Sequence, residues 1–216
     1  VVHVAPVVTH GGGGLPRQVE LQTRALDHAG HRVFLVQRPD DRFDTHEALR
    51  GRWGHLTRWE VGPRALTGHG ARWRERALGA RFTLRALIRL LRGRRRYDVI
   101  HAHQLYSPTL IGAVVKSLTG APLVVRVTAA GEGVGEVDEL ARLPFARLRR
   151  WALGKIDVVI AQTELAREEL IGAGIAPERV RIVPSAVELP AAPLPQPRTG
   201  DGPYRLLYAG RFSEEK

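Results

Sequence analysis

The first 36 residues alternate between strand-like and helix-like segments around a run of four glycines. Val1–Val8 is a mostly apolar stretch, of the kind found in a strand that is buried on both faces. Gly11–Gly14 follows, then a helical pattern that ends at Gly30, and then His31–Val36, which has the composition of a second strand. A helix that joins two consecutive strands implies that the strands are parallel. The chain is therefore predicted to be an α/β protein.

The same alternation continues through residue 183. Short apolar stretches that indicate strands are separated by segments with apolar residues at three- or four-residue steps, which indicate helices. Strands are expected at 57–61, 98–102, 122–128, 157–161 and 180–183, and helices at 71–92, 108–118, 139–153 (with a break at Pro144) and 163–171. Residues 1–185 are thus predicted to form one domain, a parallel sheet flanked by helices.

A proline-rich segment follows this domain. Six of the 14 prolines lie in residues 184–203, so 186–203 is predicted to be a linker. Tyr204–Tyr208 then has the composition of a new strand, and 204–216 is predicted to begin a second domain. Because the chain contains no methionine and stops shortly after that strand, we expect it to be a piece of a longer protein.

Composition excludes several classes of protein. The chain has 216 residues, of which 44% are hydrophobic and 25% charged, as in globular domains. It has no cysteine, which excludes disulfides and thiolate chemistry within it, and no apolar run approaches the roughly 20 residues of a membrane-spanning helix. No secretory signal is recognisable near Val1, and we therefore expect a cytoplasmic protein.

Most of the net charge of +11 lies in one segment. Residues 72–96 hold ten arginines and one acid, a formal charge of +9. On a helix, the arginines Arg74, Arg81, Arg85, Arg89 and Arg92 form one stripe, beside an apolar stripe of Trp73, Ala77, Leu84, Leu87 and Leu91.

This helix has three interpretations. It lies on an anionic membrane at the inner face of the bilayer, or it packs its apolar stripe on the sheet with the arginines in water. Nucleic-acid binding is the third and is disfavoured, because aromatic residues do not interleave the arginines. No nucleic-acid partner is expected.

The glycine run is a candidate phosphate or sugar contact. A glycine-rich turn between a strand and a helix lets backbone amides approach a ligand at the positive end of the helix. The dinucleotide-binding fingerprint does not fit, because its third glycine falls on Pro16 when it starts at Gly11 and on Arg17 when it starts at Gly12. A flexible connector is the alternative.

Two histidines follow a predicted strand. His101 and His103 are two residues apart, so they point to the same face if the strand extends that far, with His103 nearer the crevice. A metal needs more ligands, and neither cysteines nor an H-E-x-x-H pattern is present, so no metal site is predicted. A purely structural role is the alternative for both.

Three further charged residues lie in predicted loops. Glu132, in the loop 129–137, is a speculative catalytic group that would hydrogen-bond a polyol or orient a nucleophile, and a solvated acid is the alternative. Arg211 and Lys216 follow the last predicted strand and could together hold a diphosphate, although their spacing alone favours surface cations.

Four stretches together resemble a known family. They are Gly11–Val33, Tyr97–His103, Ile156–Glu188 and Tyr204–Lys216, and their order and spacing are similar to the amino-terminal domain of a retaining glycosyltransferase of the glycogen-synthase-like "group 1" kind, glycosyltransferase family 4. These enzymes have the GT-B architecture, two Rossmann-like domains facing across a cleft. The resemblance implies the acceptor-side domain and the start of the domain that binds the nucleotide sugar.

The resemblance also implies roles for residues. Gly12 and Gly13 would lie beside the donor diphosphate and sugar, Arg211 and Lys216 would neutralise the phosphates, and His103 would lie on the acceptor side. The reaction would move a sugar from a nucleotide-diphosphate sugar to a glycan, lipid or small-molecule acceptor with retention, without a metal or other cofactor. Many relatives have a histidine after the strand at 122–128, and 127–132 has none, which leaves Glu132 as a speculative substitute.

Two alternatives remain at this point. One is a GT-B protein that epimerises a nucleotide sugar, and the other is a peripheral membrane-binding module built on the arginine-rich helix. Because half of the cleft would lie beyond Lys216, the 216 residues alone are predicted to be inactive as a transferase.

Overall fold

The computed structural model describes residues 1–5, 14–38, 56–61, 72–131, 135–142 and 144–187. The chain divides into two compact units, Val1–Ala186 and Val187–Lys216, and the fold given below is that of the first. The strand expected at Tyr204–Tyr208 lies outside the described residues.

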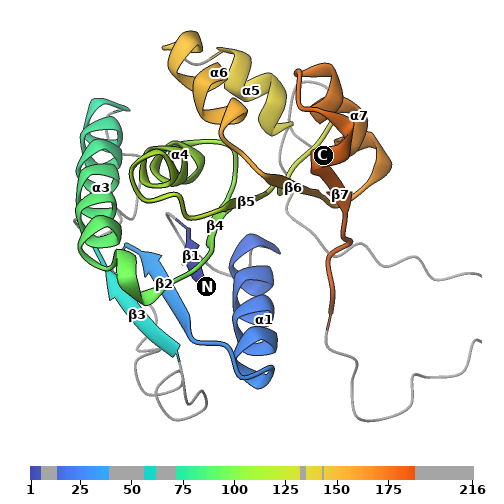
Figure 1. The fold of residues 1–216 in the computed structure, drawn as a ribbon. Coiled ribbons are helices and arrows are strands. Elements are labelled where there is room, and N and C mark those ends of the chain that lie inside the picture. Colours follow the sequence, from blue (N-terminus) through green and yellow to red (C-terminus); the bar gives the residue numbers. More distant parts are fainter. Residues whose placement is uncertain (6–13, 39–55, 62–71, 132–134, 143, 188–216) are drawn as a thin grey trace, which may run out of the picture. The chain divides into compact units, whose positions relative to one another are not determined.

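A parallel sheet of seven strands organises this unit (Figure 1). The strands are β1 (Val2–Val4), β2 (Val33–Gln37), β3 (Leu56–Glu60), β4 (Ile100–His103), β5 (Leu123–Arg126), β6 (Val158–Ala161) and β7 (Val180–Ile182). Their order is β3-β2-β1-β4-β5-β6-β7, and every neighbouring pair is parallel. The predicted α/β class is confirmed.

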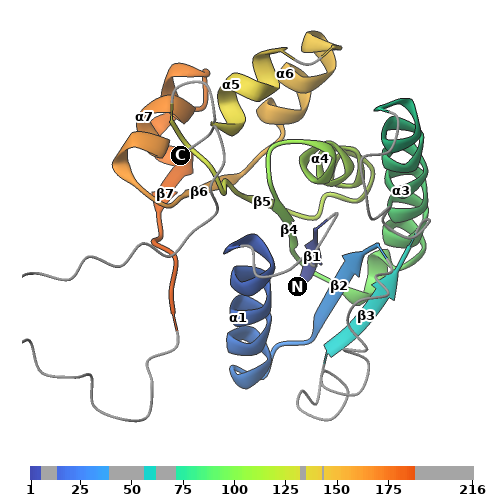
Figure 2. The ribbon, with the colours of Figure 1, turned by 180° about the vertical axis from the view of Figure 1, so that it is seen from behind.

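Helices cover both faces of the sheet. They are α1 (Gly14–His28), α3 (Arg72–Arg92), α4 (Ser107–Thr119), α5 (Glu136–Arg142), α6 (Ala146–Gly154) and α7 (Glu164–Gly172), with 3-10 turns at Arg94–Arg96 and Pro177–Arg179. Figures 1 and 2 show α1 on one side of the sheet and α4 to α7 on the other. None of the described helices is long and apolar enough to span a bilayer.

The larger core lies on the side of α4. Paired strand residues share a face in a parallel sheet, and the row of Val2, Ile100 and Leu123 points to this side. These residues are fully buried together with Phe82 of α3 and Ile111 of α4. A smaller apolar cluster on the side of α1 joins Ala5, Val19 and Leu35.

Helix ends follow the expected signals. The Thr163 hydroxyl accepts a hydrogen bond from the Ala166 amide at 3.2 Å and caps α7, and Gly120 ends α4 with a left-handed φ of 78°. Pro144 lies between α5 and α6, as predicted. The expected start of this helical region at Glu139 was wrong, because the helix begins at Glu136.

The arginine-rich helix packs differently from the prediction. Phe82, Ala86 and Leu90, at four-residue steps, form its buried face, whereas Leu84 in the predicted apolar stripe is 59% exposed. Ala77 is also exposed, and Leu87 and Leu91 are half-buried at the edge of the contact. The predicted apolar stripe was thus wrong about which face of the described part of the helix is buried.

Helix α4 packs so closely on the sheet that a side chain at Gly112 would be overpacked. A Cβ there would lie 2.4 Å from Leu123 Cδ1 and 3.5 Å from Ile100 Cγ2, and Leu123 is fully buried and cannot move aside. Gly112→Ala should lower the free energy of unfolding by about 1–2 kcal/mol, because overpacking outweighs the helix propensity that alanine adds.

Gly79 provides the matched control for this prediction. It lies inside α3, and the nearest atom to its Cβ would be Arg38 Nη2 at an ordinary 3.7 Å. Gly79→Ala should therefore stabilise the chain by about 0.5–1 kcal/mol. Urea denaturation measures both changes, and a stabilising Gly112→Ala would contradict the packing described here.

Candidate functional site

The strand order locates the candidate site. Strands run β1, β2, β3 toward one edge of the sheet and β4, β5, β6, β7 toward the other, so the order reverses between β1 and β4. In open parallel sheets, ligands bind beyond the carboxyl ends of the strands at such a reversal. His103 is the last residue of β4, and His3 and His101 are paired across β1 and β4.

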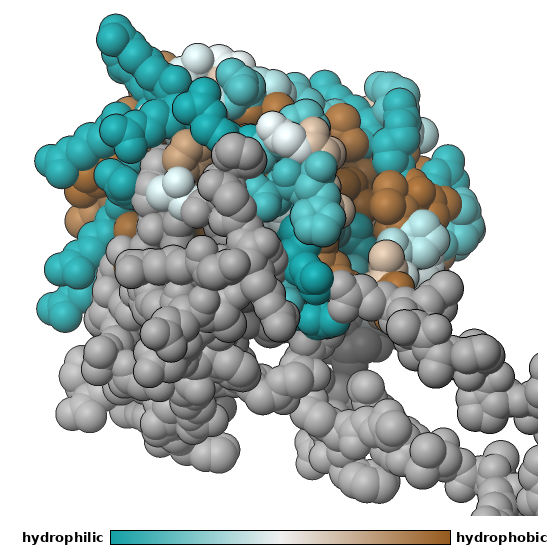
Figure 3. Space-filling view, turned by 90° about the horizontal axis from the view of Figure 1, so that it is seen from below, coloured by the Kyte–Doolittle hydropathy of each residue, from teal (hydrophilic) through white to brown (hydrophobic). Residues whose placement is uncertain are grey.

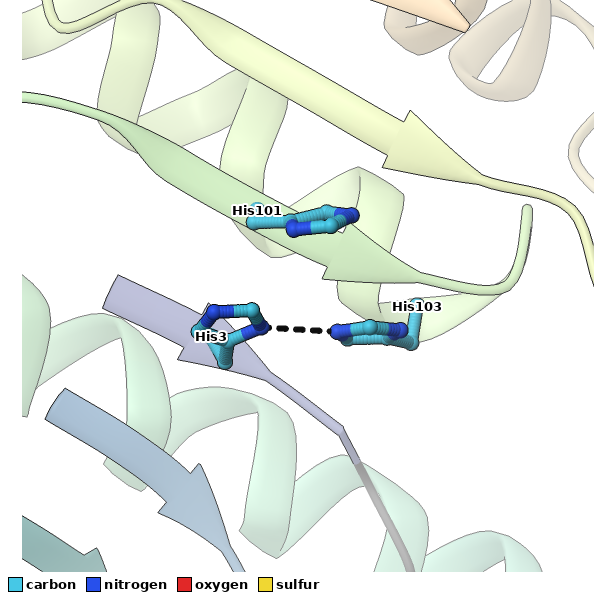
Figure 4. A group of neighbouring side chains, drawn as sticks. All are labelled: His3, His101 and His103. Carbon is cyan, nitrogen blue, oxygen red and sulfur yellow. Dashed lines mark hydrogen bonds between the residues drawn. The ribbon is translucent and has the colours of Figure 1, made fainter. Parts of the chain in front are cut away.

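Three histidine side chains gather on one face of these two strands (Figure 4). It is the face that α1 covers, because His3 pairs with Leu35, which packs against Val19 of α1. His3 Nδ1 and His103 Nε2 are 2.9 Å apart and share a hydrogen bond. The ring of His101 lies 4.5 Å from that of His103 and 4.8 Å from that of His3, centre to centre. The prediction that His101 and His103 approach each other is confirmed.

Sequence reasoning missed His3. It is a lone polar residue in an apolar strand, and that position was the available signal. Its proximity to His103 follows from the parallel pairing of β1 with β4, which the order of elements along the chain does not reveal.

Burial keeps all three imidazoles neutral. Desolvation, with a contribution from the Arg126 charge, lowers the pKa of His101 to about 4. Desolvation and the neighbouring histidines also lower the pKa values of His3 and His103 well below 6.5. At neutral pH each ring therefore carries one proton, and one nitrogen of each, His3 Nε2, His101 Nε2 and His103 Nδ1, has no partner among the described residues.

This arrangement fits a hydrogen-bonded cluster better than a metal centre. The three rings are the one group within the described ranges whose candidate ligand atoms all lie within 4.8 Å of one another. A lone pair of imidazole lies in the ring plane, but His101 and His103 are stacked with planes 24° apart. The 2.9 Å contact of His3 with His103 is also shorter than the roughly 3.3 Å between two nitrogens on one tetrahedral zinc ion. The expectation of no metal remains a prediction.

A buried arginine adjoins the histidines. Arg126 pairs with His103 in the β4–β5 register and is 1% exposed. Its Nη2 donates to Ser185 Oγ at 3.3 Å, whereas its Nε has no partner among the described residues. Burial lowers its pKa from 12.5, but an arginine stays charged at neutral pH, so the carboxyl end of β5 is electropositive.

A buried glutamate ties together the turns after β4 and β5. Glu136 Oε2 accepts from the Leu105 amide at 2.7 Å, and Oε1 accepts from the Thr128 amide at 2.8 Å and from the Thr128 hydroxyl. Burial raises its pKa, and these hydrogen bonds oppose that rise. The carboxylate thereby fixes the positions of both turns at the candidate site.

The residue that follows His103 has a strained backbone. Gln104 has a φ of 81°, which is uncommon for a residue with a side chain. Its amide donates to the Arg126 carbonyl at 2.9 Å and its carbonyl accepts from Thr109 Oγ1 at 2.7 Å. Strain held by surrounding hydrogen bonds is typical of functional sites, and here it turns the chain away at the end of β4.

Most of the predicted site residues lie outside this cluster. Gly12, Gly13, Glu132, Arg211 and Lys216 fall outside the described residues, so their roles remain predictions. His103 is described, and its side chain is fully buried against His3. In this conformation the His103 side chain has no surface that an acceptor could contact, so any effect on an acceptor would act through neighbouring residues.

The arginine stripe is only partly described. Arg81, Arg85 and Arg92 are exposed on α3 and Arg89 is half-buried, whereas nothing is described of the side chain of Arg74. In Figure 3, long hydrophilic side chains project from the side of the molecule on which Figure 1 places α3, with hydrophobic atoms between them. Leu84 and Ile88 are large apolar residues exposed on α3.

The fold is a Rossmann-like domain, and the candidate site lies at the carboxyl ends of β1 and β4, where the strand order reverses. Residues 13–186 match the model of the glycosyl transferase 4-like domain family. The chain belongs to this family, and it corresponds to the amino-terminal domain of a GT-B glycosyltransferase. No protein with curated annotation matches the sequence.

Solved structures share this fold at low sequence identity. Anabaena Alr3699/HepE in complex with UDP superposes with a TM-score of 0.55 at 15% identity, over 87% of this chain and 44% of that one. A putative UDP-N-acetylglucosamine 2-epimerase from Listeria monocytogenes gives 0.53 at 12% identity, over 83% and 43%. Another UDP-N-acetylglucosamine 2-epimerase gives 0.52 at 12%, over 84% and 46%. The chain spans less than half the length of each of these proteins.

Acid should destabilise the domain through the buried histidines. The pKa of His101 is about 4 in the folded chain against an ordinary 6.5, so between these values the unfolded state binds a proton that the folded state does not. Stability is thus complete above about pH 6.5 and decreases as the pH falls toward 4. The slope is about 1.4 kcal/mol per pH unit for each such histidine.

Urea denaturation at a series of pH values measures this slope. His101→Asn should reduce the pH dependence of the unfolding free energy by about 1.4 kcal/mol per pH unit between about pH 6 and 5, since one fewer proton is taken up on unfolding. His28→Asn, at an exposed position of α1, is the control for removing a histidine. A slope in the His101 variant equal to that of the original chain would contradict the neutral cluster.

Glu136→Gln should destabilise the chain by about 1–3 kcal/mol. Both carboxylate oxygens accept from backbone amides, so a glutamine must turn its own NH2 donor toward one of them. Glu139→Gln is the control, because its exposed side chain keeps an oxygen for the Tyr106 hydroxyl. Equal unfolding free energies for the two variants would show that Glu136 does not tie the turns together.

Proposed function

We propose that this chain is the acceptor-side half of a glycosyltransferase that moves a sugar from a nucleotide-diphosphate sugar to a glycan, lipid or small-molecule acceptor with retention of configuration. The observation that carries the proposal is the family match over residues 13–186. The matched range includes every described strand of the sheet except β1. The remaining half of the cleft would come from a second domain that begins near Tyr204.

The donor class has two lines of support. Alr3699/HepE was solved with UDP, with UDP-glucose and with UDP and glucose, and it shares the fold of this chain. In this chain, Gly12 and Gly13 directly precede α1, whose amino end attracts negative charge. With Arg211 and Lys216 as cations from the second domain, these groups would hold the diphosphate.

The described residues suit a supporting role in the reaction. Glycosyl transfer breaks the bond from the anomeric carbon to the diphosphate oxygen, and negative charge grows on the leaving group. Arg126 contributes positive potential at the crevice without a carboxylate partner in the described part of the chain, which favours that charge. The neutral histidines position the strand ends and are not proton donors in this state, and no metal or other cofactor is required.

Epimerisation of a nucleotide sugar is the second candidate. UDP-N-acetylglucosamine 2-epimerases share the fold at TM-scores of 0.52 and 0.53, so the architecture alone does not separate the two reactions. Incubation of the full-length protein with UDP-glucose and with UDP-N-acetylglucosamine, followed by proton NMR, separates them. Transfer or slow hydrolysis releases UDP and an α-configured sugar product, whereas epimerisation yields a new UDP-sugar and no free UDP.

We expect release of UDP by the full-length protein and none by residues 1–216 alone. Arg126→Gln in the full-length protein should lower kcat by at least about tenfold, because a charge that stabilises the leaving group is removed. Arg32→Gln, at an exposed position before β2, is the control. Turnover by the 216 residues alone, or epimerisation without release of UDP, would contradict the proposal.

A peripheral membrane contact through α3 is part of the proposed arrangement for a cytoplasmic enzyme. Arg81, Arg85 and Arg92 are exposed beside Leu84 and Ile88, so cations and apolar side chains lie on one helix surface. Anionic vesicles should retain the full-length protein at low salt. Equal retention after Arg81, Arg85 and Arg92 are replaced by glutamate would exclude α3 as the contact.

A further inference from the structure

A second helix exposes large apolar side chains. Phe145, which precedes α6, is 76% exposed, and Leu148 and Trp151 of α6 are 44% and 38% exposed. Single exposed apolar residues are ordinary, but these three follow one another at three-residue steps on one short helix. They lie on consecutive turns and form an apolar ridge, which we call the α6 ridge.

The α6 ridge lies in a strongly cationic segment. Residues 141–155 contain five cations and no acid, namely Arg142, Arg147, Arg149, Arg150 and Lys155. Arg142, Arg147 and Arg150 are exposed, and Lys155 Nζ lies 5.9 Å from the centre of the Trp151 ring. Sequence reasoning missed this cationic segment. Outside residues 72–96 the net charge of the chain is small, because acids elsewhere offset the cations of 141–155.

Phe145 combines a left-handed backbone with an exposed side chain. Its φ of 67° lies in the left-handed region, which bulky residues rarely adopt, and its side chain is the most exposed large apolar group of α6 and its cap. Arg149 Nη1 donates to the Leu140 carbonyl, which fixes α6 against the end of α5. The orientation of the ridge is thus set by the fold.

We propose that the α6 ridge docks on the surface of an anionic lipid bilayer. Aromatic and aliphatic side chains enter the interfacial region of a bilayer, while arginine and lysine beside them meet the lipid phosphates. A protein partner would have to offer acidic groups to this surface, because residues 141–155 carry five cations and no acid, whereas an anionic bilayer supplies phosphates in any orientation.

The position of α6 agrees with this occupant. Both α3 and α6 pack against α4, and Figure 1 shows α4 between them, so all three belong to the helix layer that faces away from the sheet. The exposed arginines of α3 would add attraction to the same surface, while the α6 ridge supplies the apolar insertion. This proposal does not depend on the glycosyl transfer proposed above.

Cosedimentation of the full-length protein tests the α6 ridge. The vesicles are phosphatidylcholine alone or phosphatidylcholine with an equal part of phosphatidylglycerol. Changing Phe145, Leu148 and Trp151 to serine should lower binding to the anionic vesicles at least about tenfold. The double variant Arg147→Glu, Arg150→Glu should lower it by a similar factor and weaken its salt dependence.

Two controls separate the ridge from general effects. Leu165→Ser removes a side chain that is 54% exposed on α7, and it should leave binding unchanged. The circular dichroism and the unfolding midpoint of each variant establish that it folds. Trp151 gives a direct readout as well, because lipids brominated in the acyl chain should quench more fluorescence in the original protein than in Trp151→Phe.

Three outcomes would overturn the proposal. They are no preference for anionic vesicles, binding by the triple serine variant equal to that of the original protein, and equal quenching with and without Trp151. Self-association in sedimentation velocity that the triple variant abolishes would instead assign the ridge to a contact between two copies of the chain. Transfer to a water-soluble acceptor should be unchanged in the triple variant, so this test fails or succeeds separately from the proposed reaction.

Discussion

The parallel pairing of β1 with β4 is the interaction on which the rest of the domain depends. It joins Val2 to Ile100 and Val4 to Ala102, and it is the point at which the strand order reverses. Because these strands lie far apart in sequence, their pairing brings His3 to His103 and leaves their carboxyl ends side by side. Ligands of open parallel sheets bind beyond the strands at such a reversal. Glu136 accepts from the Leu105 and Thr128 amides and so holds the turns after β4 and β5.

The polar groups at the carboxyl ends of β1, β4 and β5 are three neutral histidines and one charged arginine. Desolvation lowers the pKa values of all three buried imidazoles, and the Arg126 charge lowers those of His101 and His103 further, so the rings are neutral at neutral pH. The arginine is then the charged group of the cluster, and its potential is unopposed by a carboxylate among the described residues. A fold of this class that handles phosphate-bearing ligands benefits from such a bias, since no reorganisation is needed when negative charge develops.

Periodicity and helix signals predicted the fold class and most of the described elements. Thr163 caps the start of α7, Gly120 ends α4, and Pro144 lies between α5 and α6, because local backbone chemistry determines these features. Long-range pairing determines the rest. His3 lies in the candidate site only because β1 pairs with β4. The buried face of α3 consists of Phe82, Ala86 and Leu90 because these residues pack against α4 and the sheet. The α6 ridge escaped notice because exposure cannot be read from a pattern that also suits a buried helix.

The central claim is that the carboxyl ends of β1 and β4 line the site where a nucleotide sugar reacts. A crystal structure of the full-length protein with a nucleotide-diphosphate sugar tests it most directly. The account predicts electron density for the sugar and diphosphate beyond the ends of β1 and β4, between the amino end of α1 and the turn at Gln104. Density for the nucleotide sugar at the amino ends of the strands, or against the outer surface of α3 or α6, would contradict it.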